Sequence, residues 1–157
     1  MSNPTTPLEQ AQQLAQLRAR ELNLSYAGAL TPAETYTWLQ NQADTYLVDV
    51  RTSAEWQWVG QPQLAAEQYR KIEWNQASTG SRNPNFLAEL QAQVPAGATV
   101  FFLCRSGVRS HAAAEVAQAQ GYQAFNILHG FEGDKNAEGH RSTVNGWCFS
   151  QLPWHQG

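Results

Sequence analysis

The segment 99–103, which reads Thr-Val-Phe-Phe-Leu, limits the fold of this chain more than any other. Its β-branched and aromatic residues favour a strand. A strand that is apolar on both faces fits only the centre of a sheet whose two faces are covered. Cys104 follows directly, and an alanine-rich helix is expected from about Ser110 to Gln120. A buried strand that leads into a helix is typical of an α/β fold.

Strand and helix signals alternate along the rest of the chain. Further strands are expected at 46–50, 70–74 and 124–128, the second of them nearer an edge. Thr31-Pro32-Ala33-Glu34 has the pattern of a helix start, with an N-cap, a proline and a glutamate that can complete a capping box. Two more helices are expected, one beginning near Ser53 and one at 85–93 after Pro84. These lengths predict a mainly parallel sheet.

The N-terminus predicts an additional helix. Its apolar residues form one narrow stripe at helical spacing: Leu8, Ala11, Ala15, Ala19 and Leu22. We expect this helix to pack on the outside of the domain, with Gly28 separating it from the next helix. The predicted organisation is a helical extension over 1–27 followed by one domain over 28–157.

Composition excludes several classes of function. Ten Lys and Arg against thirteen Asp and Glu give a formal charge of −3, which argues against a nucleic-acid partner. No apolar run approaches the roughly 18 residues that span a bilayer, so no membrane association is expected. The first residues lack the order of a signal peptide, and two distant cysteines do not suggest a disulfide framework. We therefore expect a cytoplasmic protein.

The segment after the central strand, Cys104-Arg105-Ser106-Gly107-Val108-Arg109, has the features of a reactive site. Unpaired N–H groups at the start of a helix can cradle an anion, and the same field favours a thiolate over a thiol. Gly107 permits a tight curl of the backbone. Arg105 and Arg109 are the only formally charged residues between Leu90 and Ala114. Cys104 is therefore predicted to be a nucleophile, and Arg109 can hold an oxyanion with two parallel hydrogen bonds.

This segment, with Ser110, resembles the active-site loop of single-domain rhodaneses. Supporting matches are Asp49-Val50-Arg51 with Glu55-Trp56 on the N-terminal side, and Gly146-Trp147 with Leu152-Pro153 near the end. The resemblance covers roughly residues 29–154. Two stretches depart from the family pattern, at 60–66 and between Gly130 and Trp147.

The resemblance implies a rhodanese-like fold with a parallel five-stranded sheet between helices. It implies that a small anion such as thiosulfate gives its outer sulfur to Cys104, which becomes a persulfide and passes the sulfur to a thiophilic acceptor. The substrate would be held by Arg105, Ser106, Gly107, Val108 and Arg109, of which Arg109 and the backbone amides bind oxygens. No metal or organic cofactor is required, because the sulfur is carried covalently.

Two other functions stay open. Cysteine phosphatases and arsenate reductases also bind oxyanions in a loop between Cys and Arg, but five residues separate the two in their pattern and four do here. The shorter loop favours sulfur over a phosphoryl group. The second alternative is not an enzyme of small molecules. It is a rhodanese-fold interaction module, or a relay that passes sulfur to another protein.

The remaining candidates have more ordinary interpretations. Asp49 and Glu55 could form a catalytic carboxylate pair, but we expect them, with Arg51, to support the loops near arginine side chains. The histidines lack the spacing of metal ligands, so no metal site is predicted. Cys148 is expected beside Trp147 in a C-terminal helix, and a role as redox partner of Cys104 is disfavoured.

Overall fold

A computed structural model describes residues 5–156. Its centre is a five-stranded sheet in which every pair of neighbouring strands is parallel. The spatial order is β1 (Gly28–Leu30), β6 (Gln123–Ile127), β5 (Thr99–Leu103), β2 (Thr45–Asp49) and β4 (Tyr69–Lys71). The apolar strand β5 lies in the middle, as the sequence predicts, and β4 lies at one edge.

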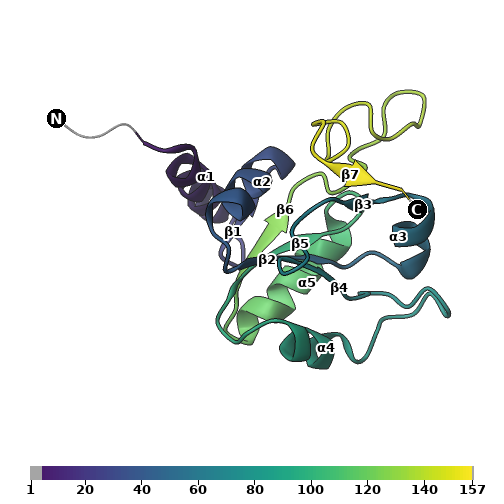
Figure 1. The fold of residues 1–157 in the computed structure, drawn as a ribbon, viewed down its shortest axis with the longest axis horizontal. Helices are drawn as coiled ribbons and strands as arrows, with labels where there is room; N and C mark the ends of the chain where they lie inside the picture. Colours follow the sequence, from purple (N-terminus) through teal and green to yellow (C-terminus); the bar gives the residue numbers. More distant parts are fainter. Residues whose placement is uncertain (1–4, 157) are drawn as a thin grey trace.

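Alternating side chains divide the interior into two cores, one on each face of the sheet. Val100 and Phe102 pack on one face with α4 (Phe86–Gln93) and α5 (Val108–Ala119). Phe101 and Leu103 pack on the other with α1 (Pro7–Glu21) and α2 (Pro32–Asn41). Figure 1 shows α1 and α2 together on one side of the sheet and α4 on the other. The α/β architecture with helices on both faces is therefore confirmed.

The additional helix α1 forms as its sequence predicts, and it packs more closely than expected. Thr6 and Glu9 form a capping box at its start, and Ala11 and Ala15 are buried against the sheet. Gly28 lies between α1 and α2, as expected, but it belongs to strand β1, which was not predicted. A Cβ at Gly28 would lie 2.5 Å from the carbonyl oxygen of Ala15, so the glycine permits the close contact between α1 and β1.

Three short elements lie beyond the main sheet. Helix α3 (Ser53–Trp58) follows β2, and β3 (Gln61–Pro62) pairs antiparallel with β7 (Trp154–His155). The expected C-terminal helix around Trp147 is wrong, because residues 141–151 form bends and turns. Trp147 is nevertheless fully buried, and its indole Nε1 donates to the carbonyl oxygen of Pro153 at 2.8 Å. Within residues 5–156, no helix is both long and apolar enough to cross a membrane.

Because the sheet is parallel, the carboxyl ends of β2, β5 and β6 gather at the same edge. Asp49 ends β2, Cys104 follows β5, and the segment beginning at Gly130 comes soon after β6. Sites in sheets of this kind form at such an edge.

Candidate functional site

The loop after β5 curls around the sulfur of Cys104. The backbone N–H of Gly107 donates to Cys104 Sγ at 3.0 Å, and α5 begins at Val108, two residues earlier than predicted. Gly107 has φ of +109°, which side-chain-bearing residues rarely adopt. The glycine therefore permits the turn that directs its own amide at the sulfur. Cys104 is only 1% exposed.

A buried polar chain supports this turn from behind. Ser110 Oγ lies 3.2 Å from Cys104 Sγ and donates to Asn126 Oδ1 at 2.6 Å. Asn126 Nδ2 in turn donates to the carbonyl oxygen of Gly107 at 3.2 Å. Ser110 is fully buried and Asn126 is 5% exposed. Sequence reasoning did not identify Asn126, although an amide at an interior position of an otherwise buried strand was a usable signal.

The backbone carbonyls of the loop are held by the segment after β6. Phe131 N–H donates to the carbonyl oxygen of Cys104 at 2.8 Å, and the amides of Glu132 and Gly133 donate to that of Arg105 at 3.0 and 3.2 Å. At Gly130, a Cβ would overlap the carbonyl oxygen of Cys104. This backbone contact was also missed, because nothing in the two separate segments indicates that they meet.

A cleft of about 430 Å³ opens beside the loop. It is lined by residues of the loop, of α3 and of the segment after β6: Glu55, Val59, Asn75, Arg105, Arg109 and Glu132. Arg105 is exposed, while Ser106 and Gly107 are partly buried. Val108 is 77% exposed at the start of α5. The structure thus brings Glu55 together with the cysteine loop, 49 residues away from Cys104 in sequence.

Glu55 binds Arg109 through both carboxylate oxygens. Arg109 Nη1 donates to Glu55 Oε1 at 2.6 Å, and Nη2 donates to Oε2 at 3.0 Å. Burial by itself raises the pKa of Glu55, but the hydrogen bonds and the charge of Arg109 outweigh it and hold that pKa below its ordinary value. Burial likewise lowers the pKa of Arg109, and the contacts with Glu55 reverse this into an increase. Both groups are therefore charged at neutral pH.

Asp49 and Arg51 form a second pair that lies in the core and not in the cleft. Both side chains are fully buried, and Arg51 Nη2 donates to Asp49 Oδ2 at 2.7 Å and to the carbonyl oxygen of Gly60 at 2.8 Å. Tyr69 donates its hydroxyl to the same carboxylate oxygen at 2.7 Å. Arg51 also stacks over the ring of Phe131, 4.3 Å from its centroid. This network connects β2 and β4 to the segment that holds the cysteine loop.

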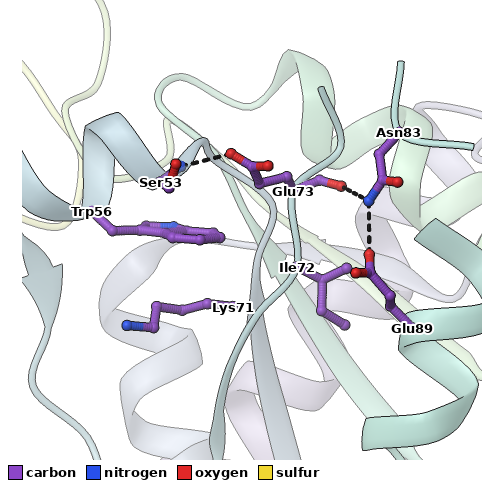
Figure 2. A pocket seen from close by; sticks show the side chains of 7 residues that line it. All are labelled: Ser53, Trp56, Lys71, Ile72, Glu73, Asn83 and Glu89. Atoms are coloured by element: carbon purple, nitrogen blue, oxygen red, sulfur yellow. Dashed lines mark hydrogen bonds between the residues drawn. The ribbon is translucent and has the colours of Figure 1, made fainter. Parts of the chain in front are cut away.

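Helix α3 carries Glu55, and residues of the helix that do not line the cleft anchor it to the segment after β4. A smaller cavity of about 190 Å³ is lined by Ser53 and Trp56 of α3 together with Lys71 and Glu73, and Figure 2 shows these side chains. Glu73 Oε2 accepts from the backbone N–H of Ser53 at 2.8 Å, which anchors the first turn of α3 (Figure 2). A helix of six residues is too short to be stable alone, so contacts of this kind set its place.

The environment of Cys148 differs from that of Cys104. Its thiol is partly buried among apolar residues of the core that faces α1 and α2. Burial raises the pKa of this thiol to about 11, against a smaller opposing effect of Arg51. Cys148 is therefore protonated at neutral pH and is a poor nucleophile.

Solved structures share this fold, and a plant protein is similar in sequence. The crystal structure of Rv0390 from M. tuberculosis is 47% identical, covers 84% of this chain and 99% of its own, and superposes with a TM-score of 0.77. The polysulfide-sulfur transferase homodimer of Wolinella succinogenes is 19% identical over 94% of this chain and 90% of its own, with a TM-score of 0.60, which is a likeness of fold alone. Rhodanese-like domain-containing protein 4 of Arabidopsis thaliana is 26% identical over 130 residues, 81% of this chain and 25% of the plant protein.

The family assignment agrees with these likenesses. Residues 27–157 match the family described as the STR4 middle domain, and this range includes the whole sheet, the cysteine loop and the segment that holds it. The protein therefore belongs to the STR4 middle-domain family and has a rhodanese-like fold.

Proposed function

We propose that this protein is a sulfurtransferase that carries sulfane sulfur as a persulfide on Cys104. The observation that supports the proposal most is the position of Cys104 Sγ inside the turn, where it accepts a hydrogen bond from Gly107 N–H at 3.0 Å. An inward-directed amide stabilises negative charge on sulfur, both in the attacking thiolate and in the persulfide.

The reaction needs one nucleophile and no cofactor. With thiosulfate as donor, the Cys104 thiolate attacks the outer sulfur, a new S–S bond forms, and the bond to the leaving sulfite breaks. A thiophilic acceptor then attacks the outer sulfur of the persulfide and regenerates the Cys104 thiolate. Arg105 and Arg109 supply positive charge in the cleft beside the loop.

Loop length supports sulfur as the group that is transferred. Four residues separate Cys104 from Arg109, one fewer than in the cysteine phosphatases. In addition, both terminal nitrogens of Arg109 bind Glu55, which leaves this fork occupied where a phosphatase needs it for a phosphoryl group. We expect no efficient hydrolysis of aryl phosphates.

Mass spectrometry of the intact protein tests the proposal. Incubation with thiosulfate should add one sulfur atom, and cyanide or dithiothreitol should remove it. Cys104→Ser should abolish the adduct, because a hydroxyl in this position forms no comparable persulfide. Cys148→Ser is the matched control and should retain it. An adduct that persists in Cys104→Ser would contradict the proposal, and rapid hydrolysis of an aryl phosphate by the unmodified protein would favour the phosphatase alternative.

A further inference from the structure

The cleft beside the cysteine loop contains as much negative as positive charge. Its two arginines, Arg105 and Arg109, are matched by two carboxylates, Glu55 and Glu132. A site adapted to a dianion would be expected to show a surplus of positive charge.

The carboxylate of Glu55 is also fixed in place. Besides its two bonds with Arg109, Glu55 Oε1 accepts from the backbone N–H of Thr52 at 3.1 Å and lies 3.2 Å from the Thr52 hydroxyl. These contacts form the capping box of α3, so moving the carboxylate away from Arg109 also removes a helix cap. A sulfonate group that needs the Arg109 fork must therefore displace a charged group that is held from two sides.

Sulfur donors differ in whether they need that fork. Thiosulfate is a dianion, and its sulfonate oxygens leave as sulfite. A persulfide, R–S–SH, carries at most one negative charge, on the sulfur that is transferred, and its leaving group is a thiolate without oxygens. Val59 lines the cleft beside Glu55 and offers an apolar surface to an organic R group.

We infer that Glu55 is a specificity-determining residue that disfavours sulfonate-bearing donors at this site and leaves persulfides as its preferred sulfur donors. The inference rests on the proposed function. The Cys104 thiolate attacks the outer sulfur of R–S–SH, forms the new S–S bond and releases R–S⁻, which takes a proton from solvent. The product is the same Cys104 persulfide, and no external oxidant or reductant is needed.

The test compares how fast two donors load Cys104. Second-order rate constants are measured by quenched mass spectrometry with thiosulfate and with hydroxyethyl persulfide, for the unmodified protein and for Glu55→Gln. The substitution keeps the shape of the side chain and removes its charge. We expect the ratio of the thiosulfate constant to the persulfide constant to rise at least about tenfold, which corresponds to about 1.4 kcal/mol. Glu21→Gln, an exposed change at the end of α1, should leave the ratio unaltered.

Circular dichroism checks that Glu55→Gln is folded, and a second variant tests the inference if it is not. Glu132→Gln removes the other carboxylate of the cleft without affecting the capping box, and it should raise the same ratio by about two- to threefold through a longer, screened interaction. An unchanged ratio in folded Glu55→Gln, or in Glu132→Gln should Glu55→Gln not fold, overturns the inference and leaves the sulfurtransferase proposal standing. Failure of both donors to load any of the proteins overturns the proposed function itself.

Discussion

Gly130→Ala tests how strongly the segment after β6 holds the cysteine loop in place. At this position φ is +64°, in the left-handed region, where a residue with a Cβ is destabilised by about 1–2 kcal/mol. The new Cβ would overlap the carbonyl oxygen of Cys104 and lie 2.6 Å from the carbonyl carbon and oxygen of Arg105. Real Cβ contacts essentially never fall below 3.0 Å, so these atoms must move apart by at least about 0.4 Å.

Moving these atoms apart should cost free energy in addition to the destabilisation from the left-handed backbone. Forcing an extra methyl group into packed structure costs about 1–3 kcal/mol. The total is about 2–5 kcal/mol of unfolding free energy, measurable by urea denaturation. The displaced atoms belong to the cysteine loop, so loading of Cys104 with sulfur should also slow by about tenfold or more, since small misplacements of reacting groups are costly.

Gly97→Ala is the matched control. Its φ is +77°, but nothing lies within 4 Å of the position that a Cβ would take. This variant should show only the destabilisation from the left-handed backbone, about 1–2 kcal/mol, and should load sulfur at the unmodified rate. If Gly130→Ala is no less stable than Gly97→Ala and loads equally fast, the segment after β6 does not hold the loop in the way described.

Three further predictions concern the charged and thiol groups. Asp49→Asn leaves the buried guanidinium of Arg51 without its counter-charge and should lower the unfolding free energy by about 3–5 kcal/mol. Urea denaturation measures this loss, and a value below about 1 kcal/mol would argue against a charged pair in the core. The folded-state pKa of Glu55 lies below its ordinary value of 4.5, so the contribution of Glu55 to the free energy of unfolding is complete above that pH and is lost as the pH falls through the folded value. In urea titrations at decreasing pH, the free energy of unfolding should therefore fall less steeply for Glu55→Gln than for the unmodified protein. An equally steep fall in the two proteins would contradict this. Cys148, with its pKa raised to about 11, should resist iodoacetamide at pH 8 in the folded protein and react once unfolded, as peptide mapping would show; equal rates in the two states would contradict its burial.

The sequence predicted those parts of the fold that depend on local pattern. The strand at 99–103 and the helix start at Thr31 were placed correctly, because apolar runs and capping boxes involve residues close together in sequence. Strand β1 was missed because three residues are too few to show a period, and its pairing with β6 is made across the whole domain. Trp147 was placed in a helix, but it lies in a turn and is buried in the core that faces α1 and α2, with its indole N–H bound to the carbonyl oxygen of Pro153.

The candidate site likewise has parts that the local sequence predicts and parts that depend on the fold. The order of strand, cysteine, glycine and helix indicated where the reactive loop would lie. The bidentate contact between Glu55 and Arg109 could not be derived, because it depends on how α3 is anchored by Glu73 and on which face of the cleft it presents. The same holds for Asn126, which reaches the loop only because β6 lies beside β5.

The contact between the cysteine loop and the segment after β6 also orders events during synthesis. Phe131, whose amide binds the carbonyl oxygen of Cys104, follows it by 27 residues. At about 5–20 residues per second, a ribosome adds those residues about 1–5 s after the nucleophile. For most of that interval, until Ile127 ends β6, β5 also lacks its neighbour, so the sheet and the loop remain incomplete together. The thiol therefore acquires its final surroundings only when the strand that completes the sheet and the backbone behind the loop have both been made.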